Sequence, residues 1–119
     1  MEDVYDLYQR GHALLKSGDF NSATVPLEKA AALEPEKTSI REALGRAYFR
    51  SRHFEKARAE FEAVVERAPT NDYALFCLGR SLLQLGRPAE ARKPLVLAAC
   101  LRPERRDYRI YRDRARAAA

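Results

Sequence analysis

The chain has 119 residues, 33% of them charged and 46% hydrophobic, a length that fits one domain with a modest core. Its two cysteines, Cys77 and Cys100, show no Cys-x-x-Cys or Cys/His spacing, which excludes a zinc pattern or a disulfide framework and favours a reducing cytoplasm. Of the net charge of +5, residues 102–119 supply +4 through seven arginines and three acids, so the basic character belongs to the end of the chain.

Neither a transmembrane segment nor a secretory signal is expected from the sequence. The chain contains no run of eighteen apolar residues. It opens on Met1-Glu2-Asp3, without a basic or an apolar leader region. We therefore expect a cytoplasmic protein without a membrane span.

A step of 34 residues recurs along the chain. It separates Gly11, Gly45 and Gly79. Three further columns keep the same step, one of alanine, one of proline and one of bulky apolar residues: Ala23, Ala57 and Ala91; Pro35, Pro69 and Pro103; Leu27, Phe61 and Leu95. A fixed period of this length indicates stacked structural repeats, so we expect a single domain over residues 1–119 with units at about 4–37, 38–71 and 72–105.

Each unit has the pattern of two helices. In the first unit, apolar residues at helical spacing begin at Val4, Gly18 ends this helix, and Asn21 or Ser22 caps a second helix that stops before Pro35. The second and third units repeat this plan around turns at residues 51–53 and 86–88. A final helix at about 106–118 alternates Tyr or Ile with Arg, which is typical of a capping helix with one face in water.

The second unit carries a recognisable motif. It reads Leu44-Gly45-x-x-Tyr48, followed by Ala57, Phe61 and Pro69, and it resembles the tetratricopeptide repeat (TPR) family. The resemblance covers residues 4–105 in three copies and implies an all-α fold, a right-handed solenoid of antiparallel helix pairs with seven helices. We expect the glycine column to let the first helix of each pair approach the alanine column of the second, so that Gly45→Leu costs roughly 1–3 kcal/mol or more.

Two features depart from the family pattern. The tryptophan column of the family falls on Leu7, Arg41 and Leu75, and we expect Arg41 to extend its aliphatic stem towards solvent there. Pro26 and Pro94 share one column inside the second helices, where each should remove one backbone hydrogen bond.

The first helices of stacked pairs line the concave face, which is the surface that repeat proteins use for binding. The 34-residue register places these candidate side chains on that face: Tyr5, Tyr8, His12, Lys16, Glu42, Arg46, Phe49, Arg50, Tyr73, Phe76, Cys77 and Arg80. Within this face, the patterns Tyr5-x-Leu7-Tyr8, Tyr73-x-Leu75-Phe76 and Tyr108-x-Ile110-Tyr111 predict an inward aliphatic residue between two aromatics at the open side. Because tyrosine and arginine are enriched at binding hot spots, the sequence favours a non-catalytic interaction module or scaffold. Its aromatic and basic groove would bind an acidic or mixed peptide segment of a partner protein.

Other function classes are less well supported. No phosphate-binding loop, Gly-x-Ser-x-Gly or His-Glu-x-x-His motif occurs, so we expect neither an enzyme nor a bound cofactor or metal. TPR modules that grip the C-terminal carboxylate of heat-shock chaperones use Lys, Arg and Asn side chains. The matching positions here are Tyr8, His12, Ala43, Tyr73 and Cys77, so the resemblance implies no such clamp.

Two alternatives stay open. One is a homo-oligomerising structural subunit that packs through the solenoid ends or the capping helix. The weaker one is a nucleic-acid-associated protein that acts through the Arg-rich stretch 102–116. For the cysteines, we expect Cys77 near the groove and Cys100 packed as a small apolar residue.

Overall fold

The computed structural model describes residues 2–118, and this part of the chain forms seven α-helices and no strand. The helices are α1 (Val4–Ser17), α2 (Phe20–Leu33), α3 (Thr38–Arg50), α4 (Phe54–Arg67), α5 (Asp72–Gln84), α6 (Pro88–Leu101) and α7 (Arg106–Ala118). The predicted all-α fold with seven helices is confirmed.

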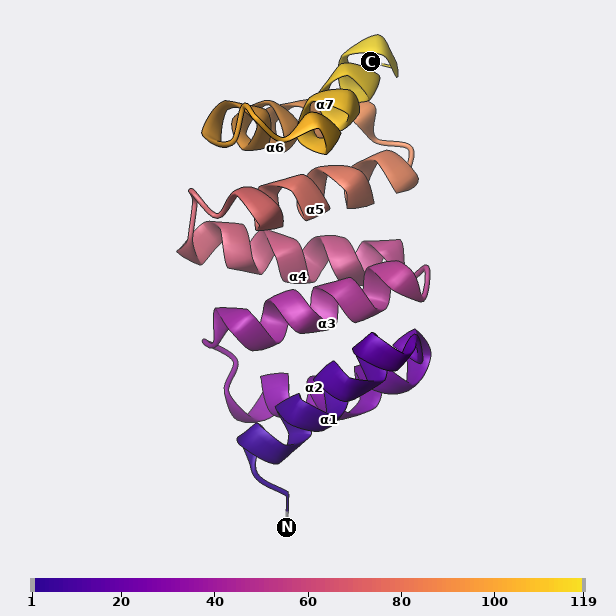
Figure 1. Cartoon of the computed structure of the whole chain (residues 1–119), viewed down its shortest axis with the longest axis vertical. Coiled ribbons are helices and arrows are strands. Elements are labelled where there is room, and N and C mark those ends of the chain that lie inside the picture. The colour runs from indigo at the N-terminus through magenta and orange to yellow at the C-terminus, as the bar shows by residue number, and fades with distance from the viewer. Residues whose placement is uncertain (1, 119) are drawn as a thin grey trace.

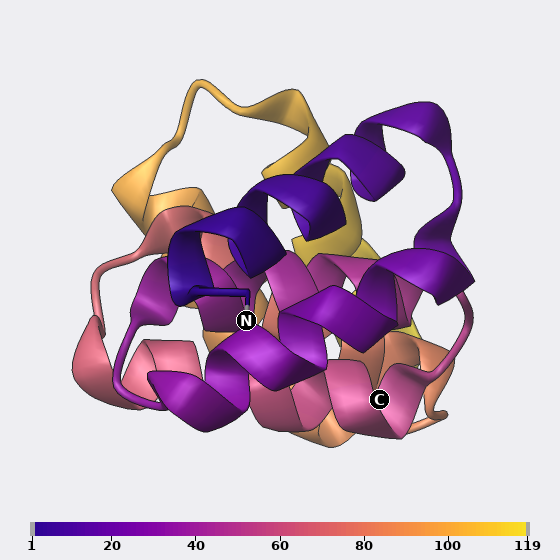
Figure 2. The ribbon, with the colours of Figure 1, turned by 90° about the horizontal axis from the view of Figure 1, so that it is seen from below.

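The helices stack in chain order along the longest axis of a molecule that measures 49 × 24 × 22 Å (Figure 1). Each helix packs against its neighbours in sequence, and α1, α3, α5 and α7 also contact one another in succession. Seen from the N-terminal end, α1 and α2 run in opposite directions in front of the later helices (Figure 2). The first helices of the pairs therefore form one continuous row, and the candidate binding residues lie on it.

The turn between α1 and α2 is shorter than the sequence suggested. Gly18, at φ 86°, ends α1 in the left-handed region, and the backbone N–H of Asp19 donates back to α1. Phe20 then begins α2 directly, so the predicted caps Asn21 and Ser22 are wrong and lie inside its first turn. The turn closes through backbone hydrogen bonds, and α2 has no side-chain cap.

The glycine column marks the closest approach of the two helices in each pair. A Cβ built on Gly11, Gly45 or Gly79 would lie 2.4 Å from Leu27 Cγ, 2.9 Å from Phe61 Cζ or 2.3 Å from Leu95 Cγ, respectively. Ordinary carbon contacts lie at about 3.5–4.0 Å. The bulky column thus fills the space that the glycines leave. The prediction that the glycines face the alanine column is corrected, although those alanines are fully buried.

Arg41 does not extend to solvent as predicted. Its Nη1 donates to Glu60 Oε1 on α4 at 2.8 Å, and its Nε donates to the carbonyl of Pro35 at 2.7 Å. Glu60 occupies the column of Pro26 and Pro94, 34 residues from each. The first and third repeats therefore combine a buried leucine of the first helix with a buried proline of the second, where the middle repeat has an ion pair.

Helix α7 covers the end of the third pair with an aromatic side chain. Tyr108 is 0% exposed, its ring lies 4.5 Å from that of Phe76, and its hydroxyl donates to Asp72 Oδ2 at 2.7 Å. Ile110 is 38% exposed, so the predicted inward aliphatic residue and the predicted outward position of Tyr108 are wrong on this helix, whereas Tyr111 is half-buried beside Arg80. The reason lies in the register, because Tyr108 follows the buried Ala74 by 34 residues and the predicted match was one residue off that step.

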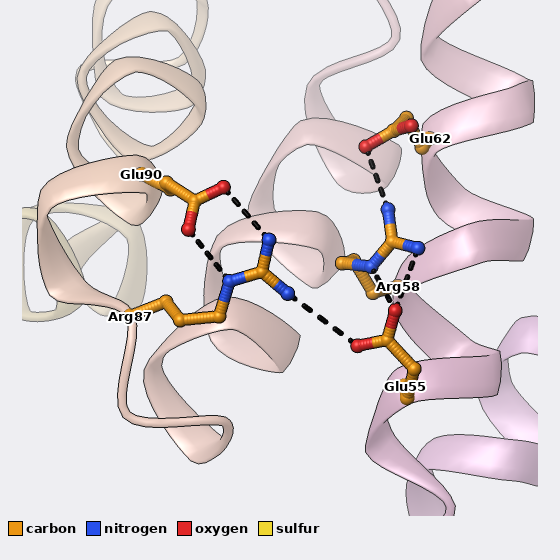
Figure 3. A network of polar contacts seen from close by, with 5 residues as sticks. All are labelled: Glu55, Arg58, Glu62, Arg87 and Glu90. Carbon is orange, nitrogen blue, oxygen red and sulfur yellow. Dashed lines mark hydrogen bonds and ion pairs between the residues drawn. The ribbon is translucent and has the colours of Figure 1, made fainter.

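The second helices are joined by a network of charged side chains (Figure 3). Arg58 of α4 binds Glu55 at 2.7 Å and Glu62 at 2.9 Å. Arg87, just before α6, binds Glu90 at 2.6 Å and reaches Glu55 at 3.4 Å. The hydrogen bond from Arg58 lowers the pKa of the Glu55 carboxyl. The arginines of this network are therefore neutralised by neighbours within the chain.

Candidate functional site

A cavity of about 160 Å³ opens among the first three pairs of helices. Its walls come mainly from α3 and α5, with contributions from the end of α1, the start of α2 and from α4. The lining residues are Leu15, Phe20, Arg46, Phe49, Arg50, Phe61, Tyr73, Cys77 and Arg80. Six of these are candidate residues from the sequence: Arg46, Phe49, Arg50, Tyr73, Cys77 and Arg80. The 34-residue register thus brings the second and third units together around one hollow.

The arginines at the cavity are held by aromatic rings rather than by acids. The guanidinium carbon of Arg80 lies 4.8 Å from the ring centre of Phe49 and 4.7 Å from that of Tyr111. That of Arg50 lies 4.3 Å from the ring centre of Phe20. Over residues 2–118, neither these two arginines nor Arg46 forms an ion pair with a carboxylate.

Arg80 also carries an unused donor. Its Nε is buried and has no hydrogen-bond partner in the described part of the chain. A buried donor without a partner costs free energy, and a charged one costs more, so an acceptor that reached this nitrogen would be stabilising. Stacking on rings leaves the edge of a guanidinium free, and this edge is the part that binds a carboxylate.

Tyr73 and Cys77 form the α5 wall of the cavity. Burial raises the pKa of the Tyr73 hydroxyl to about 12 and that of the Cys77 thiol to about 12. The thiol is therefore protonated at neutral pH, which makes it a poor nucleophile and a poor metal ligand. Glu42 of α3 lies near enough for its charge to act on both groups, and it accepts a hydrogen bond from Asn71 Nδ2 at 3.2 Å.

The candidate residues of α1 lie elsewhere. Tyr5 and Tyr8 line a second hollow between α1 and the start of α3, and neither lines the central cavity. His12 stacks on Tyr8 with ring centres 5.7 Å apart, and its buried Nδ1 has no partner within residues 2–118. Lys16 is exposed and lines neither hollow. The predicted groove is thus divided into a central cavity and a separate N-terminal hollow.

Two predicted placements need correction. Phe76 is only 5% exposed and does not line the cavity, because Tyr108 of α7 packs on its ring. Cys100 is exposed on α6 rather than packed. Cys77 lines the cavity, near the groove as expected.

Sequence reasoning missed two aromatic residues beside the arginines. Phe20 was treated as part of a turn, but it begins α2 and supports Arg50. Tyr111 was expected at the open side but was not included among the groove residues, and its ring contacts both Arg80 and Arg114. The 34-residue step carried the signal for the second case, since Tyr111 follows Cys77 by that interval.

Two kinds of site were not found. No three His, Cys, Asp or Glu side chains of residues 2–118 gather where they could hold a metal ion. Over the same residues, no helix has both the length and the apolar character needed to cross a bilayer.

Comparison with known proteins points to one family. The model of the tetratricopeptide repeat matches residues 8–71 and 42–110. None of the curated proteins matches the chain. Among solved structures, the first TPR of Spaghetti (RPAP3), bound to the HSP90 peptide SRMEEVD, is similar with a TM-score of 0.90 and 20% identity over 98% of this chain and 92% of that one.

Two further structures have comparable similarity. MamA of MSR-1 has a TM-score of 0.89 and 28% identity, covering 98% of this chain and 67% of its own. The Arabidopsis OM64 TPR domain has a TM-score of 0.88 and 19% identity, covering 98% of this chain and 96% of its own. Because their identities are below 25%, the Spaghetti and OM64 matches show the fold alone.

Proposed function

Because the chain belongs to the tetratricopeptide repeat family, we propose that it is a non-catalytic module that binds a partner protein, and that its central cavity takes an acidic or mixed peptide segment of that partner. The observation that carries this proposal is the set of arginines at the cavity, Arg46, Arg50 and Arg80, which lack carboxylate partners over residues 2–118. A ligand carboxylate would supply the missing partner.

The contrast with other arginines of the chain supports this assignment. Arg41, Arg58 and Arg87 all bind glutamates at 2.6–2.9 Å. These three arginines are therefore paired with acids of the second helices, whereas the arginines at the cavity form no ion pair over residues 2–118 even though Glu42 lies nearby. An unpaired arginine fixed against aromatic rings loses little side-chain freedom when a carboxylate binds, which favours affinity.

The relatives support peptide binding as the class of function. The TPR of Spaghetti holds a peptide, SRMEEVD, that contains three acidic residues. At 20% identity this likeness supports the fold alone, and the arginines at the cavity of this chain support the mode of binding. Because Tyr8, Ala43, Tyr73 and Cys77 stand at the positions of the chaperone clamp, we do not assign the C-terminal carboxylate of the ligand as the anchor.

Self-association is the second candidate, and exposed apolar side chains at the two ends favour it. Val25 and Leu33 are exposed on α2, in the first pair. Leu97 and Leu101 on α6 and Ile110 on α7 are exposed at the other end. Contact between unlike ends of two copies would be head-to-tail and would produce a mass that rises with concentration.

The test uses a charge reversal at the cavity with a matched control. The probes are a Glu-containing peptide and the same peptide with Gln in place of Glu, and their Kd values are measured by fluorescence anisotropy. In Arg46→Glu, the Kd of the Glu peptide should rise at least about tenfold relative to that of the Gln peptide. Arg116→Glu, the same change on an exposed residue of α7, should leave binding unchanged. Circular dichroism and light scattering of both variants confirm fold and mass. Equal loss in both variants, or equal binding of Glu and Gln peptides, would contradict the proposal.

A further inference from the structure

We propose that the peptide segment bound at the central cavity is extended and lies along the row of first helices α3, α5 and α7. It carries acidic side chains at every third residue, which pair in turn with Arg46, Arg80 and Arg114. This inference rests on the proposed function and specifies the ligand for it. Its three arginines come from successive first helices, α3, α5 and α7.

The three arginines share one position of the 34-residue repeat. Arg46, Arg80 and Arg114 are separated by 34 residues each, so they hold the same position in three successive first helices. His12 holds that position in α1, and the row of arginines therefore begins in the second unit. Because α3, α5 and α7 contact one another in succession, the three side chains follow the long axis of the molecule.

The ring of Tyr111 links two of these arginines. The guanidinium carbons of Arg80 and Arg114 each lie 4.7 Å from the ring centre of Tyr111. The two carbons are therefore no more than about 9.4 Å apart, twice that distance. Phe49 lies on Arg80 from the α3 side at 4.8 Å. Phe49, Arg80, Tyr111 and Arg114 thus alternate along the α5–α7 part of the row, and Tyr111 keeps the two cations close to each other.

The distance between equivalent arginines of neighbouring first helices matches the repeat of an extended peptide. Neighbouring helices pack about 8–10 Å apart, and this sets the step between equivalent arginines. A polyproline II segment has three residues per turn and rises about 3.1 Å per residue, so side chains at i and i+3 share a face about 9 Å apart. In a β-strand, residues i and i+2 share a face only about 7 Å apart. Acidic residues at every third position of a polyproline II segment therefore match the row.

The charges of the three arginines are unpaired. None of Arg46, Arg80 and Arg114 has a carboxylate within ion-pair distance in the part of the chain that the structure describes, residues 2–118. Three unpaired cations in line complement three carboxylates in line. Of the other arginines at this end, Arg105 and Arg112 bind Asp107 and Asp113. Arg106, Arg109 and Arg116 also lack a carboxylate partner over residues 2–118, so register and ring contacts, rather than missing partners alone, distinguish Arg114 on α7.

The test compares peptides of one composition. The probe is a labelled nine-residue peptide of three Glu-Pro-Ala units, which favours the polyproline II conformation. Two permutations place the three Glu residues at alternate positions or in one block, and a fourth peptide replaces Glu by Gln. The spaced peptide should bind the full chain at least about fivefold more tightly than either permutation.

Variants of α7 identify the third contact. Arg114→Gln should weaken the nine-residue peptide about threefold to fivefold, and should not change binding of a six-residue peptide with two Glu-Pro-Ala units. Arg116→Gln, an equal loss of charge on the same helix, should leave both affinities unchanged. If Arg114→Gln and Arg116→Gln weakened the longer peptide equally, the row would not be the binding element and the inference would be overturned.

The outcomes separate this inference from the proposed function. If all three acidic peptides bound equally and the Gln peptide did not bind, the third-residue spacing would be wrong while the proposed function stood. The spacing would also be overturned if the alternate or block arrangement bound best. If no acidic peptide bound at concentrations up to about 1 mM, both proposals would fail.

Discussion

Replacing Gly79 by alanine tests how closely the two helices of a pair approach. The added Cβ would lie 2.3 Å from Leu95 Cγ and 2.5 Å from its Cδ2. Carbon atoms in contact prefer about 3.5–4.0 Å. Leu95 is fully buried on α6 and has little room to turn away. Either the helices must separate or Leu95 must leave its preferred rotamer.

The expected cost follows from two opposing terms. Overpacking a core typically costs about 1–3 kcal/mol, and an approach of 2.3 Å to a fully buried side chain belongs to the upper part of that range, about 2–3 kcal/mol. Alanine in place of glycine inside a helix stabilises by about 1 kcal/mol. We therefore expect Gly79→Ala to lower the free energy of unfolding by about 1–2 kcal/mol, and the Tm by roughly 4–8 °C. Gly11→Ala should behave alike, and Gly45→Ala should cost less because its nearest atom, Phe61 Cζ, lies at 2.9 Å.

A double-mutant cycle measured by urea unfolding isolates the contact. Leu95→Ala alone should cost about 2–5 kcal/mol through the cavity it leaves. In the double variant with Gly79→Ala, the new methyl group fills part of that space. The combined cost should therefore fall short of the sum of the single costs by about 1 kcal/mol or more.

The control comes from the same column. Asp113 on α7 follows Gly79 by 34 residues and is exposed, so Asp113→Ala should change stability by no more than about 0.5 kcal/mol. The reasoning would be refuted if Gly79→Ala were as stable as the wild type. It would also be refuted if the cycle were additive within about 0.5 kcal/mol.

Two further predictions concern α7 and the cysteines. Tyr108→Phe should cost about 1–2 kcal/mol in urea unfolding, because it leaves Asp72 without the hydroxyl that donates to it at 2.7 Å; an unchanged midpoint would contradict this. In iodoacetamide labelling followed by mass spectrometry, exposed Cys100 should react well before Cys77. Because burial raises the pKa of the Cys77 thiol to about 12, it stays protonated below that pH, and its labelling should speed up about tenfold per pH unit through the neutral range. Equal rates in the folded protein would refute the assignment.

Much of the fold could be predicted because the 34-residue interval restricts every unit at once. The columns of glycine and of bulky residues lie where two helices meet, so one register gives both the helices and their facing sides. The same register grouped six of the nine residues that line the central cavity. Each repeat contacts only its neighbours, so the sequence of one repeat and the next is sufficient to predict the fold.

The predictions that were wrong concern residues whose positions depend on contacts between units or that depart from the 34-residue step. Tyr108 was compared with a motif one residue off the step, whereas the strict step pairs it with the buried Ala74. The burial of Phe76 requires the ring of Tyr108 from another helix, which no pattern within α5 reveals. Tyr5 and Tyr8 share the register of the first helices, yet they line a separate hollow between α1 and the start of α3.

The ion pair between Arg41 and Glu60 restricts how a gene for this chain can be rearranged. The two residues lie 19 positions apart in one repeat, and the flanking repeats carry leucine and proline instead. Duplication of a whole repeat carries both partners together. A crossover between positions 41 and 60 would place a partly buried arginine beside a proline, or a glutamate beside a leucine, and an unpaired charge there is strongly destabilising. For an exchange that involves the middle repeat, the helix pair rather than the single helix is therefore the smallest unit that recombination can transfer without separating these partners.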